Sequence, residues 1–350
     1  MKKGKTFSPE SFGVVGAGPV GAILAAFLGK GGYDVTLCDV LPQLTAPALD
    51  PGLIIEGAED FEQVVSRTCS GVDDLADQTP DVIFLTVKAN ALPLIGAAIE
   101  GFYREGLYVV SWQNGIDTEL ELARTLGRKA VMRAVVNYGC SLLKPGRVHM
   151  AFHHPPHYIQ ELDPESRHAA IAISEVLTKS GLETRHTDQI VSMIWRKAIL
   201  NACMNPVCAV TGMTMAQAMN DPIVFQIIDA LVKECVKVAR ANEISLGWDF
   251  YPYGMEYMKK AGDHKPSMLI DIEMKRRTEI DFINGKFAEY GAQAGVETPY
   301  NMTLRALVKA LEPKECPSGN HRFPDGAFSI QQSAFSLAFD FTCFVPIADS

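Results

Sequence analysis

Near its start the sequence carries three glycines in the spacing G-x-G-x-x-G, at Gly16, Gly18 and Gly21. A short apolar run, residues 12–15, precedes them, and an apolar helical pattern, residues 22–28, follows them. In such a context Gly16 allows a tight turn, Gly18 lets a pyrophosphate approach the backbone, and Gly21 lets the helix pack close to the sheet. The free amides at the helix start then face an anion. The pattern predicts a dinucleotide-binding unit of strand, helix and strand.

An acid follows this turn at the expected distance. The complete predicted phosphate-binding turn is Gly16, Ala17, Gly18, Pro19, Val20 and Gly21. A second strand pattern, residues 33–38, leads to Asp39, which lies 18 positions after Gly21; an acid about 20 residues on binds the adenosine ribose of NAD. A carboxylate there would repel a 2′-phosphate, and residues 40–43 include neither Arg nor Lys. The sequence therefore favours NAD(H) over NADP(H) as the cofactor.

Composition limits the remaining classes. The chain of 350 residues has a formal net charge of −9 and no basic patch, which argues against a nucleic-acid partner. Its eight cysteines are scattered, without metal-ligand spacing, as is typical of a reduced compartment. The basic first residues precede no signal-peptide core, and no run is long and apolar enough to cross a membrane. We expect a cytoplasmic protein with no membrane partner.

The order of the patterns predicts two domains. Near-continuous apolar runs at residues 80–88 and 107–112 are typical of parallel strands buried on both faces. Each leads to a polar residue, Lys88 and Asn114, at the carboxyl end of the predicted sheet, where ligands collect. From Asp188 the pattern becomes helical. We expect three parts: an α/β Rossmann-type dinucleotide-binding domain over 1–187, an all-α substrate and dimerisation domain over 188–312, and an apolar tail over 313–350.

The helical half contains a polar stripe. Lys197, Asn201 and Asn205 recur at i, i+4 and i+8, so they line one face of an otherwise apolar helix. Buried polar groups need partners or a ligand, which makes this stripe a candidate site. Further on, Ser267 can begin a helix and offer a hydroxyl to an anion there, although a plain helix cap explains it equally well. We predict one continuous helix over Met268–Gly285.

Taken together these segments resemble the ketopantoate reductase (2-dehydropantoate 2-reductase) family. The resemblance covers roughly residues 12–310 and rests on the order and spacing of several short pieces. Those pieces are Gly16–Gly21, Thr86-Val87-Lys88-Ala89, Gln113-Asn114-Gly115, Trp195-Arg196-Lys197 with Asn201 and Asn205-Pro206, Ser267-Met268-Leu269 with Asp271-Ile272, and Thr278-Glu279-Ile280-Asp281 with Asn284-Gly285.

The resemblance implies a Rossmann domain followed by a helical domain like the C-terminal domain of 6-phosphogluconate dehydrogenase, with the active site between them. It also implies hydride transfer from a nicotinamide to a small 2-keto acid, and a homodimer. On this basis Lys197 would be the general acid that protonates the developing alkoxide. Glu279 would hold a substrate or ribose hydroxyl and position Lys197. Such acid catalysis commonly contributes roughly 10²–10⁴-fold.

Five further roles follow from the same resemblance. Ser267 and Asn201 would bind the carboxylate and polar groups of the substrate, and Asn205 would support this polar surface. Lys88 and Asn114 would contact the cofactor on its ribose and nicotinamide side. NADP(H) stays open, because many family members use it.

The sequence also departs from the family. Asp39 stands where many members carry a basic residue, and His264 stands where an Asn is usual. These departures leave an NAD-dependent D-2-hydroxyacid dehydrogenase open beside ketopantoate reduction. A non-enzymatic NAD sensor is the third alternative, but the pair Lys197 and Glu279 argues against it. We expect no metal site at His153, His154 and His157, and we expect the tail to pack on the helical domain or on a partner subunit.

Overall fold

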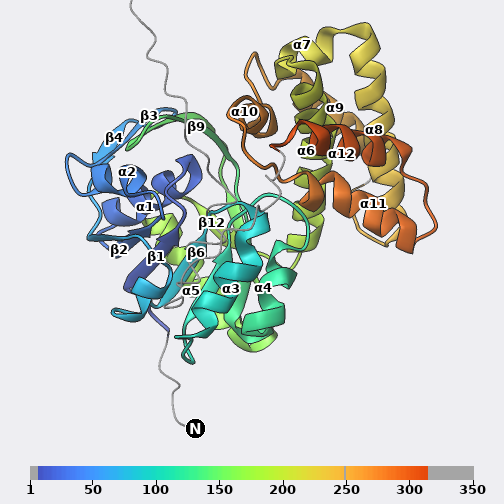
Figure 1. Ribbon diagram of the computed structural model, residues 1–350. Coiled ribbons are helices and arrows are strands. Elements are labelled where there is room, and N and C mark those ends of the chain that lie inside the picture. Colours follow the sequence, from blue (N-terminus) through green and yellow to red (C-terminus); the bar gives the residue numbers. More distant parts are fainter. Residues whose placement is uncertain (1–6, 248–249, 314–350) are drawn as a thin grey trace, which may run out of the picture.

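The computed structural model describes residues 7–247 and 250–313. It forms two parts, an α/β part and a helical part, and α6 leads from one to the other (Figure 1). The main sheet has eight strands among the described residues, in the order β12-β11-β8-β7-β6-β1-β2-β5. Its strands are β1 (Ser11–Val15), β2 (Asp34–Cys38), β5 (Arg67–Cys69), β6 (Val82–Leu85), β7 (Tyr108–Ser111), β8 (Val131–Val135), β11 (His157–Glu161) and β12 (Thr184–His186).

All neighbours in this sheet run parallel except β8 and β11, which pair antiparallel. Helices cover both faces, so the strands are apolar almost throughout. One face packs on α1 (Pro19–Lys30) and α5 (Arg167–Lys179), and the other on α3 (Leu92–Glu100) and α4 (Thr118–Leu126). The expected Rossmann-type α/β domain is confirmed.

A second sheet of four strands lies beside the main one, in the order β4-β3-β10-β9. Its strands are β3 (Leu53–Gly57), β4 (Phe61–Gln63), β9 (Tyr138–Lys144) and β10 (Arg147–His153). The short helix α2 spans Pro42–Thr45. Single 3₁₀ turns lie at Ala46–Ala48, Asp73–Ala76, Ala89–Ala91, Arg128–Ala130, Pro164–Ser166 and Ile280–Phe282. The second sheet places β9 on the side of the α/β part that faces the helical part (Figure 1).

The helical part has an apolar core that Ile116 and Val135 of the α/β part join, and α6 supplies many of its buried residues. Its described helices are α6 (Ile190–Thr211), α7 (Met215–Asn220), α8 (Pro222–Ala241), α9 (Phe250–Lys259), α10 (Ser267–Glu273), α11 (Asn284–Gln293) and α12 (Pro299–Leu311). The last strand of the α/β part ends at His186 and α6 begins at Ile190. None of the described helices is long and apolar enough to cross a membrane. The predicted packing of the tail lies outside the described residues.

A proline inside α6 explains one buried asparagine. Pro206 has no N–H, so the carbonyl of Ala202, four residues earlier, lacks its usual helical donor. The Asn284 side chain supplies the missing hydrogen bond: its Nδ2 lies 3.0 Å from Ala202 O and 2.9 Å from Asn301 Oδ1. The bond joins the start of α11 to the middle of α6, next to the polar stripe.

The prediction of one helix over Met268–Gly285 is wrong. Helix α10 ends at Glu273, Lys275 takes a positive φ of 53°, and the next helix begins only at Asn284. Residues 275–278 carry no apolar side chain that could hold a further turn on the core. The Thr278 amide and hydroxyl instead bind Glu312 Oε1, at 2.9 and 2.6 Å. The break places Glu279 in a loop at the junction of the two parts.

Candidate active site

The glycine turn follows β1 and is held by backbone and hydroxyl contacts. Gly16 has a φ of 106°, which favours glycine, and its amide donates to Cys38 O at 2.8 Å. The Thr86 hydroxyl lies 2.9 Å from Val15 O and 2.8 Å from Gly16 O. A Cβ on Gly21 would lie 1.8 Å from Gly16 O. Strand and helix therefore approach more closely than any other residue at position 21 would allow.

The same turn leaves space where a dinucleotide phosphate would need it. A Cβ added at Gly18 would meet no described atom within 4 Å. Helix α1 begins directly after it with Pro19, and no side chain caps this helix start. The Ala17 amide is already occupied, because it donates to Asp39. An open backbone surface at an uncapped helix start fits a pyrophosphate.

Asp39 follows β2 and faces this turn. Its Oδ2 accepts the Ala17 amide at 2.7 Å and its Oδ1 accepts the Leu41 amide at 3.0 Å. Burial raises the pKa of this carboxyl, and the two amide bonds work in the opposite direction. A carboxylate has about four acceptor positions, so Asp39 keeps capacity for ribose hydroxyls. The structure thus brings Asp39 to the predicted cofactor turn.

Lys88 lies after β6 and pairs with acids of the helical part. Its Nζ is 2.5 Å from Asp271 Oδ2 and 3.8 Å from Glu279 Oε2. Arg276 approaches the other oxygen of Asp271 at 3.1 Å. Burial lowers the pKa of Lys88, but the charges of Glu279 and Asp271 outweigh it and the pKa is raised. Lys88 is therefore a fixed ammonium group that bridges the two parts.

Glu279 is the acid that connects both lysines of the site. It is buried, and burial raises the pKa of its carboxyl although Lys88, the Ala89 amide and Lys197 lower it. Among the described groups it forms an ion pair with Lys88, and its coupling to Lys197 is of longer range. In the structure Glu279 therefore contacts Lys88 and interacts with Lys197 only at longer range.

A second bridge lies at the turn after β7. The Ile116 amide donates to Phe282 O at 2.8 Å, and Asp117 accepts from Tyr290 Oη at 3.0 Å and pairs with Lys286 Nζ at 3.1 Å. Asn114 lies at the start of this turn, half-buried, and its side chain bonds to no other described residue. The turn thus contacts the helical part, while the side-chain amide of Asn114 is available to a ligand.

Lys197 projects from α6 to the α/β part. Its Nζ donates to Val136 O at 2.5 Å. Burial and the nearby Arg133 lower the pKa of Lys197 to about 8, while Glu279 and Cys140 act in the raising direction. An ammonium that titrates near neutral pH is suited to general acid catalysis.

Three of the predicted polar side chains have no hydrogen-bond partner among the described residues. Asn201 is half-buried and Asn205 is buried, both on the stripe of α6 that carries Lys197. Ser267 is exposed as the first residue of α10, where its side chain forms no cap. Because buried amides need partners, these groups fit a polar ligand.

Sequence reasoning overlooked a buried arginine. Arg133 lies on β8 with 3% of its surface exposed, and its Nη2 donates to Gly115 O at 2.9 Å. Its Nη1 donates to Ser111 Oγ at 2.9 Å, and its Nε lies 3.5 Å from Glu119 Oε2. Arg133 fixes the turn after β7 and adds positive charge near Lys197. A charge within the apolar run 131–136 was the available signal.

Thr86 and Asp271 lie within segments that resemble the family, and the structure gives each a contact: Thr86 with Val15 O and Asp271 with Lys88. Thr86 follows a buried strand at the carboxyl end of the sheet. Asp271 lies four residues after Ser267, on the same face of α10. The sequence indicates where both residues lie in their elements, but it does not indicate which residues they contact.

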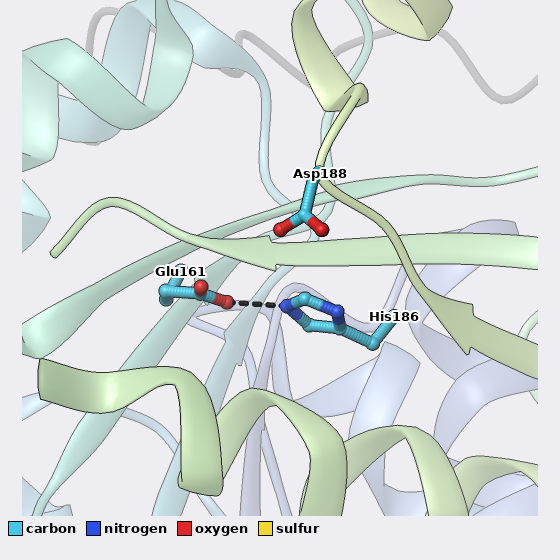
Figure 2. A group of neighbouring side chains, drawn as sticks. All are labelled: Glu161, His186 and Asp188. Atoms are coloured by element: carbon cyan, nitrogen blue, oxygen red, sulfur yellow. Dashed lines mark hydrogen bonds and ion pairs between the residues drawn. The ribbon is translucent and has the colours of Figure 1, made fainter. Parts of the chain in front are cut away.

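One further group could hold a cation by geometry. Glu161, His186 and Asp188 offer ligand atoms within 4.8 Å of one another, at the end of the α/β part. Figure 2 shows His186 facing Glu161, with their contact at 2.6 Å. Asp188 is already bound by both Nη atoms of Arg167, at 2.6 and 3.0 Å. The same guanidinium lies 3.8 Å from Glu161 Oε1, so Arg167 pairs with both carboxylates of the group.

The chain is similar to known proteins along most of its length. Residues 12–164 match the family described as "Ketopantoate reductase PanE/ApbA", and residues 189–312 match its C-terminal counterpart. A 2-dehydropantoate 2-reductase of Pyrococcus horikoshii is 30% identical over 85% of this chain and 96% of its own length. One from Streptococcus pyogenes is 29% identical, over 85% and 97%.

Solved structures give the same relationship. D-Mandelate dehydrogenase with NADH and anilino(oxo)acetate has a TM-score of 0.78 and 26% identity, covering 86% of this chain and 97% of that one. A 2-dehydropantoate 2-reductase of Geobacter metallireducens has a TM-score of 0.77 at 23% identity, covering 86% and 99%, and supports the fold alone.

Proposed function

Because the chain belongs to the ketopantoate reductase family, and is therefore an oxidoreductase that acts on a CH–OH group with a nicotinamide cofactor, we propose that it reduces a 2-keto acid with NADH. The first candidate substrate is 2-dehydropantoate, since the similar curated proteins carry that name. The observation that carries the proposal is Lys197, a half-buried lysine at the junction whose ammonium donates to Val136 O and whose pKa is lowered to about 8.

In this proposal Lys197 is the general acid. Reduction of a ketone leaves negative charge on oxygen, and an ammonium group at that position stabilises the charge and delivers the proton. Val136 O holds the ammonium in place. Lys88 keeps its own charge between Asp271 and Glu279 and so supplies a fixed positive potential rather than a proton.

The substrate would lie against the free polar groups of the helical part. Asn201 and Asn205 follow Lys197 on the same face of α6, and Ser267 begins α10. Their unpaired amide and hydroxyl groups can bind a carboxylate and a hydroxyl. This arrangement would place the carbonyl of a short 2-keto acid beside Lys197.

The cofactor would be held by the glycine turn, by Asp39, and by Lys88 and Asn114. When bound, the nicotinamide supplies the hydride that the carbonyl carbon accepts. Gly18 leaves room for the pyrophosphate, and Asp39 offers a negative charge to the ribose. That charge repels a 2′-phosphate, so we propose NADH as the preferred cofactor.

A second candidate is an NAD-dependent D-2-hydroxyacid dehydrogenase of other specificity. The D-mandelate dehydrogenase structure with NADH favours it, because that relative combines this fold with the cofactor that Asp39 selects in our proposal. The two candidates share every role given above and differ only in the side chain of the keto acid.

A coupled set of rate measurements tests both. The oxidation of NADH and of NADPH is followed by absorbance with 2-dehydropantoate, phenylglyoxylate and branched short 2-keto acids. Highest kcat/KM for 2-dehydropantoate with NADH supports the first proposal, and preference for another keto acid supports the second. Turnover with none of them would overturn both and favour the non-enzymatic NAD sensor. Faster turnover with NADPH would refute the argument from Asp39.

A further inference from the structure

One peptide unit is bonded at both ends to side chains of the site region. The carbonyl of Val136 accepts the ammonium of Lys197 at 2.5 Å. The N–H of the same peptide, that of Asn137, donates to His157 Nδ1 at 3.0 Å. A peptide group is a conjugated unit, so the two bonds act on one electronic system.

His157 is held firmly in this position. It begins β11 and its exposed fraction is 0%. Its ring packs edge-on against Tyr138, with centroids 5.5 Å apart, and is stacked with His153 at 5.3 Å. The Asn137 side chain donates to Pro156 O at 2.7 Å, which fixes the peptide from its other side.

The bond to Asn137 also determines the proton on the ring. A backbone N–H can only donate, so Nδ1 must be unprotonated and the proton is on Nε2. That Nε2 is buried and bonds to no described group. Burial, His153 and Lys197 lower the pKa of His157 to about 3, so the ring stays a neutral acceptor through the physiological range.

We propose that His157 is a positioning residue for Lys197 and acts through the peptide that joins Val136 to Asn137. By accepting the N–H, Nδ1 increases the negative charge on the carbonyl oxygen, because hydrogen bonds in a chain polarise one another. The oxygen then holds the Lys197 ammonium more strongly and keeps it aimed at the substrate. The proposal rests on the proposed role of Lys197 as the acid.

The alternative is a histidine that only fills the core. The two roles differ in what they require of the ring. A core residue needs volume, whereas a positioning residue needs an acceptor at Nδ1. His157→Asn keeps an oxygen near the place of Nδ1, His157→Gln moves its amide to the place of Nε2, and His157→Leu removes the acceptor. His153→Leu is the matched control, because His153 is stacked on the same ring but bonds to Glu59 and not to the peptide.

The primary measurement is the pKa of Lys197 in the cofactor-free protein. It is read from the ¹³Cε chemical shift in lysine-labelled protein, assigned with Lys197→Arg, and needs no turnover. We expect His157→Leu and His157→Gln to lower the pKa of Lys197 by roughly 0.1–0.6 pH unit, because they remove the polarisation of the Lys197 hydrogen bond and not that bond itself. His157→Asn and His153→Leu should leave it near that of the wild type.

The second measurement is steady-state kinetics at pH 7. We expect kcat to fall roughly 1.5-fold to fourfold in His157→Leu and His157→Gln, because the Lys197 hydrogen bond is weakened but not lost, while KM for NADH is unchanged. Equal behaviour of the Asn and Gln variants would overturn the inference, and this comparison holds even if the Leu variant does not fold. If the wild type turns over no keto acid, the proposed function fails, but the titration of Lys197 still decides whether His157 acts on it.

Discussion

The two lysines at the junction of the α/β and helical parts differ in almost every electrostatic respect. Lys88 belongs to the α/β part and pairs with two acids of the helical part, and its pKa is raised. Lys197 belongs to the helical part and donates to a neutral carbonyl of the α/β part, and its pKa is lowered to about 8. Each lysine is therefore held by the opposite half of the molecule.

The difference shows how one chain can obtain two functions from one side-chain type. An ammonium between carboxylates stays charged and serves as a point of attachment. An ammonium that is desolvated beside Arg133 loses its proton more readily and can act as an acid near neutral pH. In the proposed function the α/β half would therefore bind the cofactor and the helical half would protonate the substrate.

Removal of the Lys197 amine should have the largest effect. Lys197→Ala should lower kcat by roughly 10²–10⁴-fold, because the proton donor is lost, and leave the Kd of NADH unchanged. Lys88→Ala should instead weaken NADH binding more than it lowers kcat. Steady-state kinetics and NADH fluorescence titration measure both. The comparison breaks if Lys197→Ala weakens NADH binding as much as it slows turnover.

Loss of the Asp39 carboxylate should change the preference between the two cofactors. Asp39→Ala removes charged hydrogen bonds, which should raise the Kd of NADH roughly tenfold to a hundredfold. Binding of NADPH should change little or improve, because a repulsive charge disappears, and it serves as the internal control. Titration of both cofactors measures the ratio. An unchanged ratio of the two Kd values would show that Asp39 does not bind the ribose.

The pH dependence should identify the titrating lysine. A general acid works in its protonated form, and the pKa of Lys197 is lowered to about 8. The kcat of keto-acid reduction should therefore be level below that pH and fall about tenfold per pH unit above it. Lys88→Arg should keep this break, since the raised pKa of Lys88 holds it charged throughout. A break that vanished in this variant would assign the acid to Lys88.

The smallest effect is expected in the scaffold that carries Lys197. Asn284→Ala leaves Ala202 O without its donor and should reduce the free energy of unfolding by about 1–3 kcal/mol. Pro206→Ala restores a helical N–H to that carbonyl, so Asn284→Ala should cost less in this background. Urea unfolding of the four proteins of this cycle measures the coupling. Additive effects would show that Asn284 does not substitute for the missing amide.

Sequence reasoning worked where short-range pattern decides the structure. The glycine turn, its acid at Asp39, and the stripe of Lys197, Asn201 and Asn205 all depend on spacing within one or two elements. The two-part fold follows from the order of such elements.

Long-range partners could not be read in this way. Lys88 and Asp271 are 183 positions apart, and Lys197 and Val136 are 61 positions apart. The helix predicted over Met268–Gly285 is broken by the tie of Thr278 to Glu312, at 34 positions. In each case the sequence contains both partners, but only tertiary packing selects them.

The crossed attachment of the lysines has a consequence for the working cycle. If the halves separated to exchange ligands, Lys88 would leave its acids and Lys197 would leave Val136 in the same movement. Once in water, Lys197 would recover a basicity near that of free lysine and become a poorer donor. Lys197 would then be a strong acid only while the two halves are closed on each other. A substrate that can still dissociate would face an inactive enzyme, and an enclosed substrate would face an active one.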